Sequence, residues 1–266
     1  MSNLRNQLSL FNPMGRLWRL FATGFSFTAF GIGGLLLWLF VFPCLTLLVW
    51  NEAKRIHFAR TIIRGSFHCF IGLMHRLGVL HYQIIGQEKL ERAGLLLLAN
   101  HPTLIDTVFL MALVKRADCI VKSGLWNNPF TRGPVRAASY INNEQGSELV
   151  DACIGSLKNG NNLIIFPEGT RTPAHGAIQL KRGAANIAIR GAQNVTPIII
   201  HCDPPTLGKG EAWWKIPSRR VRFIIEIKDD IPVTHFLEQG HSEVLAARRL
   251  TEHLQHYFTE EKAHHA

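Results

Sequence analysis

The N-terminal part of the chain has a different hydrophobic pattern from the rest. No Asp, Glu, Lys or Arg occurs between Leu20 and Trp50, and about 20 apolar residues are enough to cross the hydrocarbon core of a membrane as a helix. The run is too long for the apolar part of a signal peptide, and no small-residue cleavage site follows it. The pattern therefore predicts a membrane-embedded helical anchor within residues 1–54.

Two arrangements of this anchor in a membrane are open. Gly31, Gly33 and Gly34 stand in the middle of the run, where glycine weakens a helix and permits a turn or a kink. Basic residues flank the run on both sides: Arg5, Arg16 and Arg19 before it, and Lys54, Arg55, Arg60 and Arg64 after it. Positively charged flanks favour the cytoplasmic side. Two such flanks predict a helical hairpin that dips into the bilayer, and a single span is the alternative.

Residues 55–78 predict a basic amphipathic helix. Apolar side chains recur at steps of three and four, at Ile56, Ile63, Phe67, Phe70, Met74 and Leu77. Basic side chains follow helical steps on another face, at Arg60, Arg64, His68 and His75. Such a helix beside a membrane anchor fits contact with anionic lipid head groups. A helix whose basic face is simply solvated explains the same pattern.

From residue 79 onward, short apolar runs alternate with helical stretches. The predicted strands are Val79–Ile85, Leu95–Ala99, Cys119–Val121, Leu163–Phe166, Val195–His201 and Val221–Ile227. The predicted helices are Leu104–Lys115, Glu148–Lys158, Lys181–Arg190 and His241–Phe258, and residues 208–218 are expected to form a loop. Strands separated by helices indicate an α/β fold. Residues 79–266 are therefore expected to form one α/β domain with a mostly parallel central sheet flanked by helices.

Charge and cysteine content narrow the classes of partner. The formal net charge of +10 favours an anionic partner: a nucleic acid, a membrane surface or a phosphorylated substrate. The basic residues are spread along the chain without a nucleic-acid-binding motif, so no nucleic acid is expected as a partner. The five cysteines lie far apart and form no CxxC pair, which argues against a disulfide framework and against a thiolate zinc site.

The segment Asn100–Asp106 (NHPTLID) carries the first candidate chemistry. It follows the apolar run LLLLA, and in open α/β sheets ligands collect beyond the carboxyl ends of strands. Pro102 suits the first position of a helix. With His101 just outside that helix, the Asp106 carboxylate can reach one imidazole nitrogen and leave the other to accept a proton from a hydroxyl.

The surroundings of His101 indicate how such a base acts. Neither Ser nor Cys lies beside it in the sequence, so direct attack by an acceptor hydroxyl is expected rather than a covalent acyl-enzyme. Backbone N–H groups at the start of the following helix are expected to stabilise the oxyanion.

The segment Phe166–Arg171 (FPEGTR) ends the apolar run NLIIF. Pro167 and Gly169 shape a turn, which places Glu168 and Arg171 at the end of a strand. A guanidinium group offers paired donors for a phosphate. A structural ion pair between Glu168 and Arg171 is the alternative.

Taken together, these segments resemble the glycerolipid acyltransferase family, which includes 1-acylglycerol-3-phosphate and lysophospholipid acyltransferases. The resemblance rests on NHPTLID, on FPEGTR roughly 65 residues later, and on the LKRGA and VTPIII that follow, and it extends from about residue 80 to residue 230. It implies O-acyl transfer from an acyl thioester, of coenzyme A or acyl-carrier protein, to a lysophospholipid such as 1-acylglycerol-3-phosphate. It implies no further cofactor and no metal. It also implies membrane lipids as partners. The expected location is the inner (cytoplasmic) membrane, with the catalytic domain on the cytoplasmic side, where the basic flanks are favoured.

The resemblance also implies roles for individual residues. His101 corresponds to the catalytic base and Asp106 to its partner. The acceptor-binding residues correspond to Glu168, Gly169, Thr170 and Arg171, with Lys181 and Arg182 in a basic turn behind them. Pro197 matches the proline of the family's last block.

One position departs from the family pattern. Where the family usually has Gly-x-x-Phe-Ile-x-Arg, residues 137–143 read AASYINN, so that Asn143 replaces an arginine that binds the acceptor phosphate. The cationic side chain that would bind the phosphate is therefore either missing or supplied by Lys122, Arg132 or Arg136. A specialised lipid that is not a glycerophosphate is therefore an alternative acceptor. A membrane-associated thioesterase and a non-catalytic lipid-binding protein are alternative functions.

Overall fold

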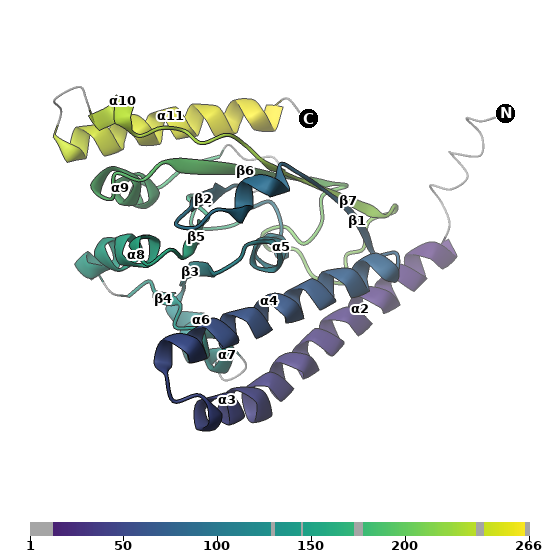
Figure 1. The fold of residues 1–266 in the computed structure, drawn as a ribbon. Coiled ribbons are helices and arrows are strands. Elements are labelled where there is room, and N and C mark those ends of the chain that lie inside the picture. The colour runs from purple at the N-terminus through teal and green to yellow at the C-terminus, as the bar shows by residue number, and fades with distance from the viewer. Residues whose placement is uncertain (1–12, 129–130, 145, 173–177, 238–241, 264–266) are drawn as a thin grey trace.

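The chain folds around one twisted sheet with helices on both faces (Figure 1). The structure is a computed structural model that describes residues 13–128, 131–144, 146–172, 178–237 and 242–263. Its sheet has seven strands in the order β1-β7-β6-β2-β5-β3-β4. Only the contact between β6 and β7 is antiparallel; the other neighbouring strands run parallel. The prediction of a mostly parallel sheet flanked by helices is confirmed.

The six strands expected from the apolar runs are all present. They are β1 (Leu80–Ile85), β2 (Leu96–Ala99), β3 (Ala117–Val121), β5 (Asn162–Ile165), β6 (Val195–Asp203) and β7 (Val221–Ile227). A seventh strand, β4 (Ile141–Asn142), was not predicted because two residues form no recognisable apolar run.

Strand β2 lies at the centre of the domain, and its side chains point alternately to two cores. Leu97 packs with Phe109 and Phe223 on one side, whereas Leu96 and Leu98 pack with residues of the opposite helical layer. One layer holds α5 (Asp106–Leu113) and α4 (Glu52–Arg76); the other holds α8 (Leu149–Lys158), α9 (Gly183–Arg190) and α11 (Glu243–Ala263). Burial on both faces explains why β2 is uniformly apolar.

The helices predicted in the α/β domain are also present, with shifted ends. α5, α8, α9 and α11 correspond to the four predicted helices, although the predicted start at His241 lies outside the described residues. The short helices α6 (Ser123–Asn127), α7 (Arg132–Ala137) and α10 (Thr234–Leu237), and the 3₁₀ turns Gln87–Glu91 and Gly146–Glu148, were not predicted. Segments this short contain too few residues to show helical periodicity.

The N-terminal run forms one continuous helix instead of turning at its glycines. α2 (Pro13–Leu36) passes through a π-helical stretch at Leu37–Val41 into α3 (Phe42–Leu48). A Cβ atom at Gly31, Gly33 or Gly34 would meet nothing within 4 Å, so no packing demand bends the chain there. The turn that these glycines permit is therefore not made there.

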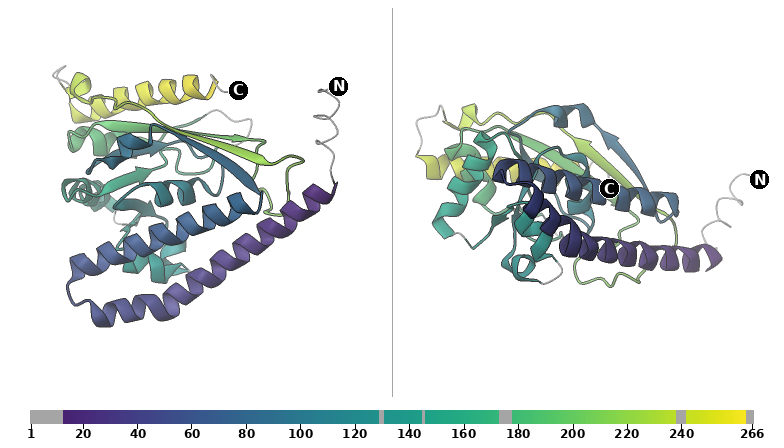
Figure 2. Two further views of the ribbon diagram at one scale, coloured as in Figure 1. Left: turned by 45° about the vertical axis from the view of Figure 1, so that its right-hand side comes forward. Right: turned by 60° about the horizontal axis from the view of Figure 1, so that its bottom comes forward.

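The chain reverses farther on, between α3 and α4. Asn51 caps α4, since its side chain accepts a hydrogen bond from the Lys54 N–H at 3.0 Å. α4 then runs back along α2 (Figure 2). Phe27 packs against Phe70 with 5.6 Å between ring centroids, and Phe30 against Phe67 with 5.5 Å. The two helices therefore form an antiparallel pair on one side of the domain.

Most of α2 and α3 is left uncovered by the rest of the chain. The segment Gly15–Leu48 is long and apolar enough to cross a membrane. Its exposed large apolar side chains are Leu17, Trp18, Phe21, Phe25, Ile32, Leu36, Leu39, Phe40, Val41, Leu47 and Leu48. The choice between a span and a hairpin in the bilayer stays a prediction, and Arg5 lies outside the described residues.

Two basic side chains of α4 contact the α/β domain. Arg60 pairs with the buried Asp118, with 2.9 Å between Nη2 and Oδ2. Arg64 donates from Nε to the Ala112 carbonyl at 3.1 Å, at the C-terminal end of α5. The expectation of a freely solvated basic face is therefore wrong for these two residues, because both hold α4 against the domain.

Candidate active site

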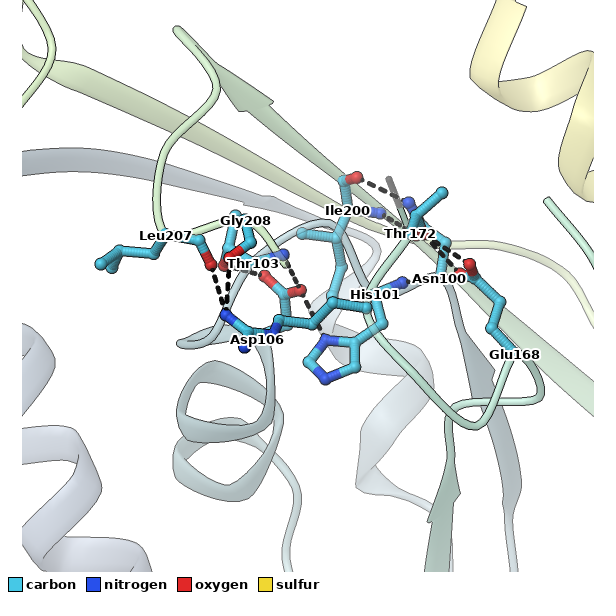
Figure 3. A network of polar contacts seen from close by, with 10 residues as sticks. Asn100, His101, Thr103, Asp106, Glu168, Thr172, Ile200, Leu207 and Gly208 are labelled. Atoms are coloured by element: carbon cyan, nitrogen blue, oxygen red, sulfur yellow. Dashed lines mark hydrogen bonds and ion pairs between the residues drawn. The ribbon is translucent and has the colours of Figure 1, made fainter. Parts of the chain in front are cut away.

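The predicted contact between His101 and Asp106 is present at the C-terminal end of β2. The strand ends at Ala99, a turn carries His101, and α5 begins at Asp106. The distance between His101 Nδ1 and Asp106 Oδ2 is 2.9 Å (Figure 3). The Asp106 side chain is fully buried and that of His101 is 16% exposed, so the imidazole stands between the carboxylate and the outside.

Asp106 is held in one orientation by its other partners. Its Oδ2 also accepts the Thr103 N–H at 2.6 Å, and its Oδ1 accepts the Thr103 hydroxyl. Burial raises the pKa of the Asp106 carboxyl, and the hydrogen bonds from His101 and Thr103 oppose that rise. Because both oxygens are occupied from inside the chain, the carboxylate can only act on the imidazole.

The other nitrogen of His101 is available. Its Nε2 makes no hydrogen bond to any residue that the structure describes. The ring stacks on Phe166, with 4.2 Å between centroids and 24° between planes, so its orientation is fixed on two sides. A hydroxyl arriving from outside can therefore meet an oriented base.

The backbone around His101 does not supply the expected oxyanion donors. The His101 N–H donates to Glu168 Oε1, that of Thr103 to Asp106 and that of Leu104 to the Leu207 carbonyl at 3.1 Å. Pro102 has no N–H. All the amides of residues 101–104 are thus engaged, and the expectation that this turn stabilises an oxyanion is wrong for these residues.

Glu168 connects the two predicted motifs. It is buried, at 6% exposed, and its Oε1 accepts the His101 N–H at 3.1 Å while its carboxylate also accepts the Thr172 hydroxyl at 2.6 Å. Thr172 in turn donates its N–H to the His101 carbonyl at 2.8 Å. The carboxylate thereby ties the turn after β5 to the turn after β2. Its role in acceptor binding stays a prediction.

Arg171 contacts a third segment. Its Nη1 donates to the carbonyls of Leu207 at 2.9 Å and Gly208 at 2.8 Å, which follow β6. Glu168 and Arg171 do not form an ion pair in the part of the chain that the structure describes. Nη2 and Nε of Arg171 make no hydrogen bond to described residues, so these donors are available to a ligand.

The basic turn predicted behind FPEGTR lies against it. Lys181 donates its N–H to the Pro167 carbonyl at 2.8 Å. Its side chain crosses Gly169, where an added Cβ would lie 3.0 Å from Nζ. Lys181, Arg182 and Thr170 are all exposed. The structure thus brings Lys181 and Gly169 together, and binding by Thr170, Lys181 and Arg182 stays a prediction.

The part of the chain that contains this site matches a known protein family. Residues 81–201, which run from β1 to β6, match the profile named Acyltransferase. The segment that carries His101, Asp106 and Glu168 therefore matches the acyltransferase family.

Several proteins of known name share part of this acyltransferase domain. The yeast Saccharomyces cerevisiae 1-acyl-sn-glycerol-3-phosphate acyltransferase is 28% identical over 54% of this chain and 50% of its own length. The enzyme of the same name from Pseudomonas aeruginosa is 25% identical over 52% of this chain and 56% of its own. A Caenorhabditis elegans protein provisionally given that activity, acl-2, is 33% identical over 50% of each chain. The chain thus spans about half the length of the curated relatives it matches.

A solved structure has the same fold over nearly the whole length of this chain. The crystal structure of PlsC from Thermotoga maritima, titled a 1-acyl-sn-glycerophosphate acyltransferase, superposes with a TM-score of 0.66. The match covers 94% of this chain and 97% of that one, at 19% sequence identity. The fold therefore includes the N-terminal helices as well as the sheet.

The position that departs from the family pattern has a structural role in the acyltransferase domain. Asn143 Oδ1 accepts the Ser123 N–H at 3.1 Å, which connects the ends of β3 and β4. Of the three candidates to replace the missing cation, Arg132 lies over the ring of Trp38 at 5.3 Å. Arg132 therefore contacts the N-terminal helical segment.

Sequence reasoning missed a cavity of about 730 Å³ that adjoins the turn after β2. Asn100, Pro102, Thr103 and Thr172 form one wall, and the segment after β6 forms another. Its volume lies in the range of small-molecule sites, roughly 300–1,000 Å³. The cavity is assembled from segments that are distant in sequence, so no local pattern indicates it.

Proposed function

We propose that this chain transfers a fatty acyl group from a thioester to a hydroxyl of a lipid, with His101 as the general base. The observation that carries the proposal is the contact of His101 Nδ1 with the buried Asp106, which leaves Nε2 without a partner among the described residues. This is the arrangement that general base catalysis requires.

The proposed reaction proceeds by direct attack. The acceptor hydroxyl gives its proton to His101 Nε2 while its oxygen forms a bond to the thioester carbonyl carbon. Asp106 stabilises the imidazolium that results. When the tetrahedral intermediate collapses, the carbon–sulfur bond breaks and the departing sulfur takes the proton from the imidazolium, so that ester and free thiol are released.

The proposed acceptor is a lysophospholipid of the 1-acylglycerol-3-phosphate class. The names of the relatives support this class. So do the free donors of Arg171 and the exposed ammonium and guanidinium groups of Lys181 and Arg182, because guanidinium groups bind phosphate well. Asn143 in place of a cation favours a specialised lipid without that phosphate as the second candidate.

The proposed donor is a thioester of coenzyme A or of acyl-carrier protein, with no other cofactor and no metal. The proposed location is the cytoplasmic face of a membrane, and the long apolar helix Gly15–Leu48 supports the membrane association.

The test is the His101→Ala variant, purified from the full chain and assayed with 1-acylglycerol-3-phosphate and acyl-coenzyme A or acyl-carrier protein. Loss of a general base lowers the rate by on the order of 10²–10⁴-fold, measured as acylated lipid by mass spectrometry. His256→Ala is the control, because the His256 side chain is 74% exposed on α11. Free fatty acid without acylated lipid would indicate a thioesterase, and full activity of His101→Ala would exclude His101 as the base.

A further inference from the structure

A second cavity lies between α4 and the domain, at the far end of α5 from Asp106. Its volume is about 310 Å³. Four of its lining side chains are cationic, Arg60, Arg64, Lys115 and Arg116, and no acidic residue lines it among those described. α5 has eight residues, which place this cavity about 12 Å from Asp106 along the helix. It is therefore distinct from the candidate active site.

Internal partners satisfy only part of this positive charge. Arg60 pairs with Asp118, and Lys115 pairs with Glu91 at the surface. Arg64 and Arg116 have no acidic partner in the described part of the chain; Arg116 donates from Nη2 only to the Asn159 carbonyl, at 2.8 Å. Two positive charges at one cavity are thus left without a counter-charge.

The negative end of α5 occupies only part of the Arg64 guanidinium group. The last carbonyls of a helix carry partial negative charge, and Arg64 donates to those of Ala112, from Nε at 3.1 Å, and Leu113, from Nη2 at 3.5 Å. Its Nη1, like that of Arg60, makes no hydrogen bond to described residues. Donors therefore remain for an anion that enters the cavity.

Apolar side chains lie on α4 next to the cavity. Phe58 is 47% exposed and Cys69 is exposed, and with the half-buried Ile62 they follow helical steps along α4. At about 100° per residue, this strip is adjacent on the helix to the positions of His57 and Thr61, which line the cavity. An apolar strip beside a cationic site is the pattern expected of a helix at the level of lipid head groups.

We propose that this cavity binds the phosphate of an anionic membrane lipid, with Arg64 and Arg116 as its principal ligands. The chemistry recognised is a phosphate oxyanion, and the apolar strip of Phe58, Ile62 and Cys69 favours a lipid head group over a free phosphate as its source. Cations near a membrane surface contribute about a fivefold gain in affinity each.

The experiment uses the full chain purified in neutral detergent and native mass spectrometry with phosphatidylglycerol, phosphatidylcholine or inorganic phosphate. Arg116→Gln is expected to weaken retention of phosphatidylglycerol about fivefold, and Arg64→Gln/Arg116→Gln about 30-fold. Arg248→Gln and Arg190→Gln/Arg248→Gln are matched controls, since both guanidinium groups lie in exposed ion pairs on other helices. The controls are expected to bind like the unmodified chain.

Three results would overturn the proposal. These are equal loss in the controls, equal retention of phosphatidylcholine, and binding of inorganic phosphate without binding of phosphatidylglycerol. Arg116→Gln alone decides the outcome if the double variant fails to fold, because Arg116 does not cap α5. Binding is measured without reference to acyl transfer, so the result is independent of the proposed catalytic function.

Discussion

Two regions of this chain depart from the usual distribution of polar and apolar side chains, in opposite directions. At the C-terminal ends of β2 and β5, the carboxylates of Asp106 and Glu168 are 0% and 6% exposed. On α2, Phe21 and Phe25 are 65% and 50% exposed. Buried polar groups are tolerated when each has partners, whereas a large exposed apolar surface indicates that something outside the chain covers it. The buried carboxylates at the ends of β2 and β5 have hydrogen-bond partners within the chain. The exposed apolar side chains of α2 need a covering from outside it.

The largest expected effect tests whether the buried carboxylate serves chemistry as well as structure. Asp106→Asn retains an acceptor oxygen for Thr103 but cannot stabilise a charged imidazole. We expect the variant to fold and to lose on the order of 10²–10⁴-fold in acyl transfer, measured as the rate of lipid acylation. Asp151→Asn, at an exposed ion pair with Arg190, is the control. Unchanged activity of Asp106→Asn would limit Asp106 to a structural role.

The next prediction contrasts two phenylalanines of the helical pair. Phe70 is 4% exposed and Phe21 is 65% exposed. Phe70→Ala is expected to lower the free energy of unfolding by about 3–5 kcal/mol, because it leaves a cavity. Phe21→Ala is expected to leave that free energy nearly unchanged in detergent and to weaken partition into lipid vesicles by about 10–100-fold. Denaturant unfolding and vesicle co-sedimentation measure the two effects, and equal vesicle binding by Phe21→Ala would contradict a lipid contact for α2.

The third prediction tests whether the buried Glu168 carboxylate stabilises the two turns that it connects. Glu168→Ala leaves the His101 N–H without its partner at the junction of two turns, and an unsatisfied buried donor costs about 1–3 kcal/mol. Glu168→Gln retains an acceptor oxygen and is expected to lose less stability. Thermal unfolding of the two variants measures this difference. If both were as stable as the unmodified chain, the carboxylate would not be what holds the turns together.

The smallest expected effect concerns the backbone of the same turn. Gly169 has φ = +68°, and a Cβ there would meet Lys181 Nζ at 3.0 Å. Gly169→Ala is expected to cost about 1 kcal/mol. Gly183→Ala in α9 is the control, because a Cβ there would meet nothing within 4 Å. Denaturant unfolding should separate the two variants, and equal stability would show that the turn tolerates a side chain.

The sheet could be predicted because its central strands are buried on both faces. An apolar run such as Leu95–Ala99 predicts a buried strand when polar turns lie on both sides of it. The contact of His101 with Asp106 could be predicted because a strand ends before His101 and a helix begins near Asp106, five residues later. The position at which the chain reverses after the N-terminal helix could not be predicted, because glycine permits a turn without requiring one. The cap that starts the returning helix α4, Asn51 before Glu52, is a local signal that the long apolar run obscured.

The contacts that could not be predicted are those between distant segments. Arg60 meets Asp118, and Glu168 meets His101, across 58 and 67 residues respectively. Neither helical periodicity nor motif spacing contains this information, since tertiary packing decides which polar side chains are turned inward. Arg171 is a similar case, because its guanidinium contacts carbonyls of the segment after β6.

The helix α5 is fastened at both ends. Its first residue, Asp106, is bonded to His101 and Thr103, and its last turn is bonded to Arg64 of α4. A short rod fixed in this way cannot slide or rotate without breaking bonds at one end. The position of the Asp106 carboxylate therefore depends on the N-terminal helical pair as well as on the sheet. A displacement of α4 at a bilayer surface would change how the Asp106 carboxylate is aligned with the His101 imidazole.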